Sequence, residues 1–455
     1  MDPRTPTSDP VSDFIWAACV PSGPGSGGSH SSGTLELANT LLAANPSIAG
    51  SNIYTAALLG DDAAVRNFIA LDKANATAKG GPREWDALTY LCFSKYLRLD
   101  PDRSAGLLRS AEALLDAGAD PNTGWFEQPQ QHGPEWESVI YGAAGVAHHA
   151  GMTRLLLARG ADPNDGETPY HTPESYDNDA LKALVESGKL TDVSLATLLL
   201  RKADWHDYEG IRYLLENGAD PNRSTIWKFT ALHQVLRRDN GLDNVAAMLD
   251  HGADPTLING SDHRSGISIA ARRGRRDVLE LFQQRKVPLL LKGVERLIAA
   301  CALGDTVTIR SIIADEPALL TELQAEGGTL LSEFAGTGNT EGVAHLLDLG
   351  VPVTALYAWG DGYFGIARNS TALHVAAWRA AHAVVRLLIE HGAPVDVKDG
   401  NGHTPLYMAI QACTNSYWMS RRKPDSIKAL LDAGASTEGI PIPTGYAEAD
   451  ALLSQ

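Results

Sequence analysis

The sequence contains few cysteines, and their spacing does not match the common cysteine-based sites. Four cysteines occur in 455 residues, with no CxxC or Cys/His spacing: Cys19, Cys92, Cys301 and Cys413. Neither zinc ligation nor a disulfide framework is expected from such a pattern. Each cysteine lies among apolar residues, which is typical of free thiols in a reducing compartment. We therefore expect a cytoplasmic protein without a metal site.

Long hydrophobic runs and the motifs of common enzyme classes are also missing. The N-terminal stretch MDPRTPTSDPVSDFIWAACVP has one Arg, several acids and a short apolar run. It predicts neither a signal peptide nor a membrane span. No GxSxG, P-loop, dinucleotide fingerprint, HExxH or Cys/His nucleophile pattern occurs. The sequence therefore predicts no cofactor and no membrane partner, and it favours a protein without enzymatic activity.

Basic residues are scarce relative to acidic ones. The chain has 38 Lys and Arg against 55 Asp and Glu, a formal net charge of −17. Such a surface repels phosphate backbones, so no nucleic-acid partner is expected. With 44% hydrophobic and 20% charged residues, the composition is that of a soluble, folded chain.

What the sequence does contain is one pentapeptide that recurs. GADPN occupies residues 118–122, 160–164 and 218–222, and GADPT occupies 252–256. Each copy follows an amphipathic helical end such as RYLLEN. Glycine just past the last helical turn adopts the left-handed conformation without side-chain cost, and proline prevents the helix from resuming. Each copy therefore predicts a helix, a stop and an extended loop.

Weaker copies extend this pattern along the chain. Gly188, Gly350, Gly392 and Gly434 occupy the same position, and aligning residues 277–288 with 244–255 places Arg285 there. The intervals from 188 to 218, 252 and 285 are 30, 34 and 33 residues. Units of about 33 residues with two helices and a turn are typical of ankyrin repeats.

Four further motifs carry that resemblance: TPYH at 168–171, TALH at 230–233 and 371–374, and TPLY at 404–407. The sequence resembles the ankyrin repeat family, in its bacterial-type form of a whole-chain solenoid with enlarged finger loops. The resemblance implies an all-α solenoid of about 10–11 helix–turn–helix units. We expect an N-terminal arm and Gly/Ser-rich tether at 1–33, the solenoid at 34–440 and a tail at 441–455. The family resemblance also implies a structural role for His171, His233 and His374.

Two finger loops, which join one helical unit to the next, are much longer than usual. They span residues 122–136 and 353–369 and combine aromatic with acidic residues, while a shorter finger at 223–229 carries one tryptophan. These aromatics either form a small core within each finger or face a ligand. The predicted ligand-binding residues are Trp125, Phe126, Trp136, Trp227, Trp359, Tyr363, Phe364 and Arg368.

Two carboxylates and one histidine in these loops are weak catalytic candidates. His132 and Glu135 share the first finger, and Asp361 lies on the second. Two carboxylates across a cleft could serve acid–base chemistry, as in a hydrolase or lyase acting on a sugar-like or apolar ligand. The arginine cluster ARRGRRD at 271–277 is interpreted as a solvated turn paired with acids, or as a docking spot for an anion or partner.

Two functions follow from these observations. The first is a binding module that recognises a protein through its concave face and aromatic-rich fingers, as the family resemblance implies. The alternative is an enzyme or a small-molecule or glycan-binding protein whose site lies in a cleft between the two enlarged fingers. A fold does not fix a function, so both stay open at this point.

Overall fold

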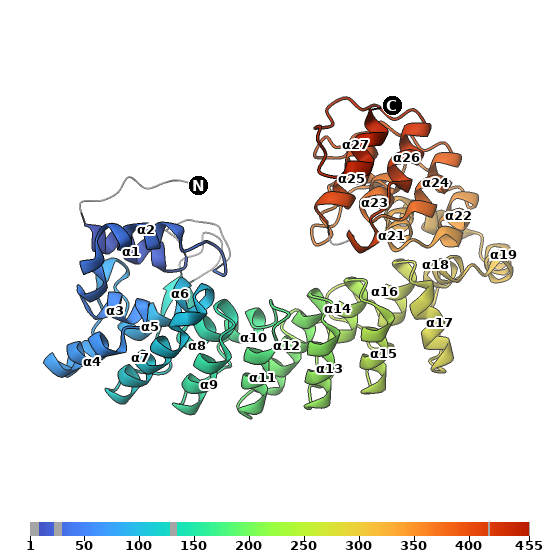
Figure 1. Ribbon diagram of the computed structural model, residues 1–455. Helices are drawn as coiled ribbons and strands as arrows, with labels where there is room; N and C mark the ends of the chain where they lie inside the picture. Colours follow the sequence, from blue (N-terminus) through green and yellow to red (C-terminus); the bar gives the residue numbers. More distant parts are fainter. Residues whose placement is uncertain (1–8, 22–29, 128–133, 417–418, 455) are drawn as a thin grey trace. The chain divides into compact units, whose positions relative to one another are not determined.

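The computed structural model describes residues 9–21, 30–127, 134–416 and 419–454. These residues form helices joined by short loops, with two small two-stranded antiparallel sheets (Figure 1). They divide into two compact units: unit 1 comprises residues 1–235 and 247–253, and unit 2 comprises 236–246 and 254–455. Within the described ranges, no helix is both long and apolar enough to cross a membrane.

The helices of unit 1 are α1 (Pro10–Ala18), α2 (Glu36–Ala44), α3 (Ile53–Leu59), α4 (Asp62–Leu71), α5 (Ala87–Cys92), α6 (Lys95–Leu99), α7 (Ser104–Asp116), α8 (Val139–Tyr141), α9 (Ala150–Ala158), α10 (Glu167–His171), α11 (Asp179–Glu186), α12 (Asp192–Asp204) and α13 (Tyr208–Glu216). Its strands are β1 (Gly124–Glu127) and β2 (Glu135–Ser138). Its 3₁₀ turns are η1 (Pro46–Gly50), η2 (Lys73–Ala76), η3 (Gly81–Arg83) and η4 (Pro101–Arg103), and the π-helical segment η5 (Gly142–Val146) continues α8.

The division between the units runs through α14 (Ala231–Arg237) and α15 (Leu242–Asp250). The remaining helices are α16 (Gly266–Arg272), α17 (Arg276–Gln284), α18 (Val294–Leu303), α19 (Thr306–Asp315), α20 (Ala318–Ala325), α21 (Gly327–Thr337), α22 (Thr340–Asp348), α23 (Ala372–Trp378), α24 (His382–Glu390), α25 (Pro405–Thr414), α26 (Asp425–Asp432) and α27 (Ala447–Leu453). Strands β3 (Leu356–Tyr357) and β4 (Ser370–Thr371) pair with each other, and η6 (Met419–Arg421) precedes α26.

Most helices follow one another in pairs along the chain (Figure 1). In the part of the chain that the structure describes, eleven pairs follow one another: α3–α4, α5/α6–α7, α8–α9, α10–α11, α12–α13, α14–α15, α16–α17, α18–α19, α21–α22, α23–α24 and α25–α26. The predicted all-α solenoid of 10–11 units is thereby confirmed.

The recurring pentapeptide ends the second helix of a pair and links it to the next pair. Gly118 has φ +107°, and Ala119 donates its N–H to the carbonyl of Leu114 at 3.0 Å, which closes the helix end. The side chain of Asn122 then accepts from the N–H of Asp162 at 2.8 Å and donates to the carbonyl of Gly160 at 3.3 Å. Asn164 and Asn222 make similar bonds, with Lys189 and Thr191 and with Gly252, so each GADPN stops its own helix and ties its loop to the next loop, which explains why the sequence is repeated.

The end of α17 has no glycine, and its position differs from the predicted one. The sequence alignment placed Arg285 in the glycine position, but Arg285 has φ −80°. The positive φ of +59° lies at Lys286, and Val287 donates to the carbonyl of Phe282 at 2.9 Å. The prediction was therefore wrong by one residue, because the loop after this cap is one residue shorter than the loop after Gly252.

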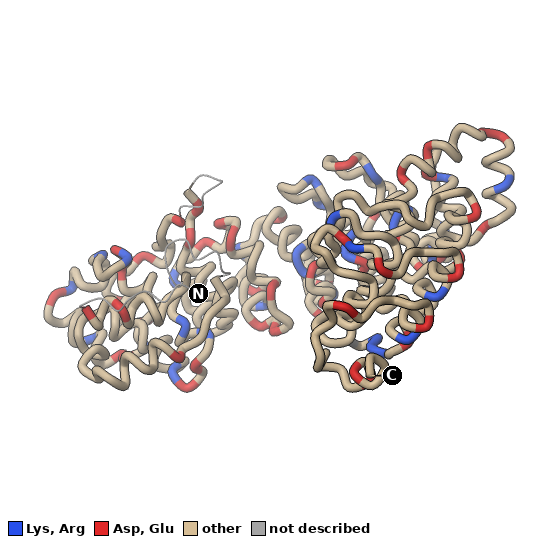
Figure 2. The backbone as a smooth tube through the Cα atoms, turned by 90° about the horizontal axis from the view of Figure 1, so that it is seen from above, with Lys and Arg blue, Asp and Glu red and all other residues tan. Residues whose placement is uncertain are grey.

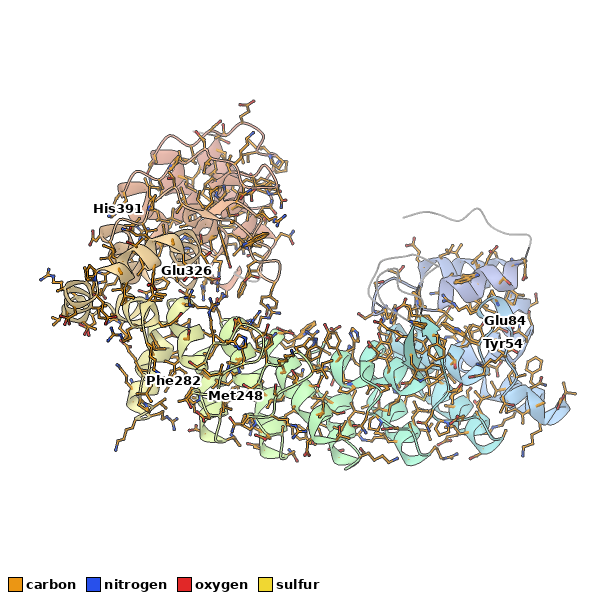
Figure 3. All side chains as sticks on the ribbon, turned by 180° about the vertical axis from the view of Figure 1, so that it is seen from behind. Tyr54, Glu84, Met248, Phe282, Glu326 and His391 are labelled. Carbon is orange, nitrogen blue, oxygen red and sulfur yellow. The ribbon has the colours of Figure 1, made fainter. Side chains whose placement is uncertain are left out.

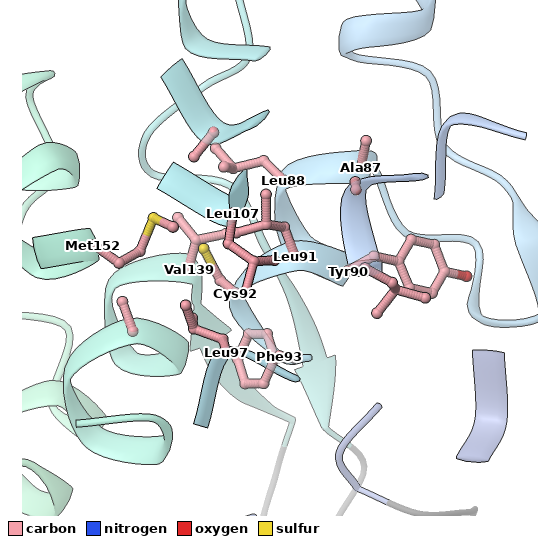
Figure 4. Packing of buried hydrophobic residues seen from close by; sticks show 14 of the residues in the cluster. Ala87, Leu88, Tyr90, Leu91, Cys92, Phe93, Leu97, Leu107, Val139 and Met152 are labelled. Carbon is pink, nitrogen blue, oxygen red and sulfur yellow. The ribbon is translucent and has the colours of Figure 1, made fainter. Parts of the chain in front are cut away.

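The core of unit 1 is built from short apolar helices. Leu88, Leu91 and Phe93 lie at the centre of this core, where α5 packs against α3 and α7 (Figure 4). Tyr54 of α3 lies at its edge (Figure 3), 5.3 Å from the ring of Tyr90. Burial of these apolar surfaces supplies the stability that a single helix pair cannot generate alone.

The N-terminal helix α1 belongs to this core. Phe14 and Ile15 are buried, and the ammonium of Lys95 donates to the carbonyl of Ala17 at 2.8 Å. Val20 donates its N–H to the carbonyl of Phe93 at 3.1 Å. The N-terminal segment therefore packs on the first helix pairs.

Unit 2 has its own core, in which α23 packs between α21 and α25. Phe334, Leu373 and Leu406 are each fully buried there. Glu326, at the start of α21, and Phe282 of α17 are marked in Figure 3. Residues of both charges are spread over the helices and loops of each unit (Figure 2).

Candidate functional site

The first enlarged finger forms a β-hairpin in unit 1. Strands β1 and β2 pair antiparallel, with Trp125 opposite Glu137 and Phe126 opposite Trp136. Because side chains alternate between the two faces of a strand, Trp125 and Phe126 point in opposite directions. The hairpin therefore has an inner face that meets the helices and an outer face.

The inner face carries Trp125. Its ring lies 4.9 Å from that of Trp85 and 5.9 Å from that of Phe93, so it extends the aromatic core of unit 1. On the outer face, Phe126 is 58% exposed and its ring lies 4.7 Å from that of Trp136. The structure thus divides the predicted aromatic group into one packing residue and an outer pair in which Phe126 is exposed and Trp136 is partly buried.

The remaining candidates in this part of the chain are Trp227, Glu135 and His132. Trp227 is 36% exposed on its short finger, 5.4 Å from the ring of Tyr170. Glu135 lies at the start of β2, opposite Glu127. His132 lies outside the described residues.

The histidine of the TPYH motif differs from the other two repeat histidines. His374 accepts from the N–H of Thr371 at 3.1 Å and reaches the carbonyls of Val397 and His403, both at 3.1 Å. His171 instead lies 3.2 Å from both Glu167 and Glu174. Burial acts to lower the pKa of His171, but these two carboxylates outweigh it and raise the pKa to about 9.

The second enlarged finger, in unit 2, folds around a small core of its own. Tyr357, Phe364 and Ile366 are buried in it together with Val375. The guanidinium carbon of Arg379 lies 4.3 Å from the Phe364 ring centre, and that of Arg238 lies 3.8 Å from the Tyr363 ring centre. Both aromatic candidates, Tyr363 and Phe364, therefore help to hold the finger together.

Trp359 and Arg368 lie on the exposed side of the same finger. Trp359 is 75% exposed, and the guanidinium of Arg368 lies 4.8 Å from its ring centre. Of the predicted ligand-binding aromatics, Trp359 presents the largest fraction of its surface to solvent. This pair is the most accessible aromatic feature of unit 2 in the predicted set.

Asp361 supports the turn of this finger. Its Oδ1 accepts the N–H groups of Tyr363 and Phe364 at 3.0 and 3.4 Å, and its Oδ2 lies 4.0 Å from Nη1 of Arg273. These contacts fix the carboxylate at the wall of a pocket of about 410 Å³ in unit 2.

Charged side chains of both signs line this pocket. We call it the arginine pocket; its charged lining residues are Arg237, Arg238, Arg264, Arg272, Arg273, Asp262, Glu326, Glu333 and Asp361. Tyr357 donates its hydroxyl to Oε1 of Glu333 at 2.6 Å. Burial is the main cause that raises the pKa of Glu333, against the opposing effect of Arg273.

Arg272 and Arg273, which line the arginine pocket, differ from one sequence interpretation. The cluster at 271–277 was interpreted as a solvated turn, but Arg273 is buried between Asp239 at 2.5 Å and Glu333 at 2.9 Å. Arg272 is also largely buried and pairs with Glu295 and Glu326, both at 2.6 Å. The predicted pairing with acids is observed, but these two residues are not solvated, because their acidic partners come from distant parts of the chain and bury the guanidinium groups.

Sequence reasoning missed Asp239 and Glu333 entirely. Asp239 is bound by Arg273 and also by Arg379, 140 residues away in the chain, at 2.7 Å. No local motif marks either acid. The only available signal was the arginine cluster itself, since buried guanidinium groups require paired carboxylates.

A second pocket of about 490 Å³ lies at the same arginine turn. Its charged residues come from turns between helices and from the first turns of α17 and α22, and include Asp239, Arg275, Arg276, Glu341 and Arg379. Arg275 pairs with Asp277 at 2.8 Å, and Arg276 pairs with Glu280 at 2.8 Å. Its lining is therefore also organised as ion pairs.

Family models match two stretches of the chain. A model of ankyrin repeats in three copies matches residues 355–438, and a model of ankyrin repeats in many copies matches residues 199–241. The first stretch contains the second enlarged finger, and the second contains the TALH motif at 230–233.

The chain is also similar to curated proteins and to one solved structure. Rabankyrin-5 of Homo sapiens is 26% identical over 344 residues, covering 68% of this chain and 25% of that protein. Serine/threonine-protein kinase 12 of Arabidopsis thaliana is 34% identical over 100 residues, covering 22% of this chain and 20% of that protein. The chain therefore spans no more than a quarter of these relatives. The crystal structure of the human ASB11 ankyrin repeat domain is 22% identical with a TM-score of 0.26, covering 59% of this chain and 98% of that domain.

Proposed function

Because this chain is an ankyrin repeat protein, we propose that it is a protein-binding module that recognises its partner through exposed finger loops and the arginine pocket. Ankyrin repeats generally mediate protein–protein interaction, and nothing in the fold adds a separate catalytic domain to the described residues. A cytoplasmic location is part of this proposal, supported by four cysteines that are free and buried.

The observation that carries the proposal is the position of the exposed apolar side chains. Loops that join successive helix pairs hold a series of large apolar residues that are at least one third exposed: Phe126, Ile226, Trp227, Ile258, Leu290, Leu356 and Trp359. Exposed aromatic and apolar groups beside polar ones are the usual anchors of a protein interface. Each unit presents such residues on its own fingers.

The character of the arginine pocket also favours a protein partner over an apolar metabolite. Pockets for small molecules are lined mostly by apolar side chains with a few polar groups. Here five arginines and four carboxylates line about 410 Å³. Guanidinium groups bind carboxylates in two-pronged fashion, but Arg272 and Arg273 are already paired with Glu326 and Glu333. A polypeptide segment bearing side chains of both charges therefore matches this lining.

The second candidate function is acid–base chemistry in the same pocket, on a glycan or another small molecule. One observation favours it: Glu333, whose pKa burial raises, and Asp361 both face Nη1 of Arg273. The cleft between the two enlarged fingers is not part of this candidate, because the fingers belong to different units. Turnover that is lost on Glu333→Gln, with peptide binding retained, would favour the second candidate.

The proposal is tested by selecting linear peptides from a random phage library against the purified chain. Selected peptides should bind wild type and lose at least tenfold in affinity for Trp359→Ala or Phe126→Ala. Matched controls are Val307→Ala on α19 and Leu71→Ala on α4, which are 79% and 81% exposed but lie outside the fingers. Failure to enrich peptides, or equal binding to finger variants and controls, would contradict the proposal.

A further inference from the structure

The inner side of the β1–β2 hairpin contacts the N-terminal segment through one histidine. His30 Nε2 lies 3.2 Å from Oε2 of Glu127, and its Nδ1 lies 2.7 Å from the hydroxyl of Tyr141. Its ring is 6.0 Å from that of Trp125 and 5.8 Å from that of Tyr141. The imidazole is therefore held in place by two aromatic neighbours, with one nitrogen facing a carboxylate.

A second carboxylate reaches the same place from β2. Glu137 is 1% exposed, and its Oε2 has no hydrogen-bond partner among the described residues. That oxygen lies 3.9 Å from Nδ1 of His30, which is too long for a hydrogen bond. Burying a carboxylate oxygen without a hydrogen-bond donor raises the free energy of the folded state. A bound cation or a proton would remove this cost.

The surroundings of Glu137 are predominantly acidic. Glu137 is buried, and the negative charges of Glu167 and Glu127 act on it, while His171 acts in the opposite direction. A positive charge bound beside Glu137 would offset both its burial and this repulsion.

The three side chains together form a recognisable donor set. One imidazole nitrogen and two carboxylate oxygens, from His30, Glu127 and Glu137, lie within 4.8 Å of one another. When Nδ1 donates its proton to the Tyr141 hydroxyl, Nε2 carries a lone pair that points at the Glu127 carboxylate. Two acceptors at 3.2 Å repel unless a cation or a proton lies between them. A partner that fixes one imidazole nitrogen is the usual second contact of a metal-binding histidine.

We propose that His30, Glu127 and Glu137 bind one divalent transition-metal ion, of the zinc or cobalt kind, that clasps the N-terminal segment to the β1–β2 hairpin. Imidazole and carboxylate ligands suit Zn²⁺ and its neighbours, with water completing the coordination. The sequence predicted no metal site, because the ligands are not close in the chain: His30 precedes Glu127 by 97 residues. The site is independent of the proposed protein binding.

Cobalt titration of tag-free, chelator-treated protein tests this site directly. Co²⁺ should bind with one equivalent and give visible d–d absorption without a sulfur charge-transfer band. Zn²⁺ should compete for the same site and raise the melting temperature. His30→Ala and Glu137→Gln should each weaken binding by at least tenfold, the effect expected from loss of one ligand.

Two controls separate this site from adventitious binding and from misfolding. Glu135→Gln lies on the same strand but outside the donor set, so it should bind Co²⁺ like wild type. Glu127→Gln removes a ligand that is 33% exposed, so it keeps the test valid if Glu137→Gln fails to fold. No binding, a sulfur charge-transfer band, or affinity unchanged in His30→Ala and Glu127→Gln would overturn the proposal.

Discussion

The two enlarged fingers have similar compositions but fold in different ways. The finger of unit 1 is a hairpin of four paired residues on each strand, and it places Trp125 against aromatic residues of the repeat core. The finger of unit 2 has only two paired residues on each strand and folds around its own Phe364. The comparison shows that aromatic content alone does not identify the contact residues of a finger, because each finger first has to support its own fold.

The strongest test of this comparison is Phe364→Ala. Phe364 is 4% exposed, packs with Tyr357 and Ile366, and lies beneath the guanidinium of Arg379. Removing a buried ring should lower the free energy of unfolding by about 3–4 kcal/mol. Scanning calorimetry measures the change. A loss below about 1 kcal/mol would contradict a self-supporting core in this finger.

Trp125→Ala should have the next largest effect, in unit 1. The ring is half-buried and packs on Trp85 and Phe93, so its loss should cost about 2–3 kcal/mol. Its strand neighbour Phe126 is 58% exposed, and Phe126→Ala should cost less than about 1 kcal/mol. Urea unfolding of the two variants compares the inner and outer faces of the hairpin. Equal losses would contradict the division between those faces.

One titratable group in each unit should change stability with pH in the opposite direction to the other. The folded pKa of His171 is raised to about 9, above its unfolded value, so its stabilising effect is complete below pH 6.5 and is lost as the pH rises through 9. The loss should be at most about 3 kcal/mol, reduced by the partial exposure of the ion pairs, and should be absent in His171→Gln. Urea unfolding at pH 6 and pH 9.5, with wild type and variant in parallel, isolates this contribution.

Asp239 provides the opposite case in unit 2. Burial acts to raise its pKa, but Arg273 and Arg379 outweigh burial and hold it well below the ordinary value. Its contribution is therefore present above pH 3.8 and is lost as the pH falls toward the folded pKa. Unfolding at pH 2.5 and pH 5 should show the loss in wild type, and Asp239→Asn should reduce that difference. A variant with the same acid sensitivity as wild type would contradict this assignment.

Trp359→Ala should have the smallest effect on stability. The side chain is 75% exposed and contacts Arg368, so the free energy of unfolding should change by less than about 0.5 kcal/mol. Thermal unfolding of this variant beside Phe364→Ala distinguishes the outside of the finger from its core. A loss above about 2 kcal/mol would show that Trp359 belongs to that core.

The sequence predicted most of the helical framework because its signals are local. A glycine and a proline a few residues apart end a helix wherever they occur, so GADPN marked the helix ends correctly at Gly118 and at Gly218. The cap near Arg285 was misplaced by one residue because it lacks glycine. There a non-glycine residue, Lys286, adopts the positive φ, and no sequence signal distinguishes it from its neighbour.

The candidate sites were less predictable, because they depend on pairs of residues that are distant in the chain. The aromatic fingers could be found from their length and composition, but the burial of Phe364 and the exposure of Trp359 could not. Their environments depend on how each finger folds back on its helices. Asp361 was singled out for chemistry, whereas its observed contacts include two backbone N–H groups of its own turn.

The sequence by itself determined the repeat, its helix pairs and the loops between them, since each follows from interactions among residues close in the chain. Only the tertiary structure decided which charges are buried and which groups face one another. Asp239 binds Arg379, which lies 140 residues away in the chain, and His30 contacts Glu127, which lies 97 residues away. Packing of helices and loops within each unit brings these groups together and removes water from them. A buried charge is stable only with a partner in place, so each candidate site exists only once its own unit is folded.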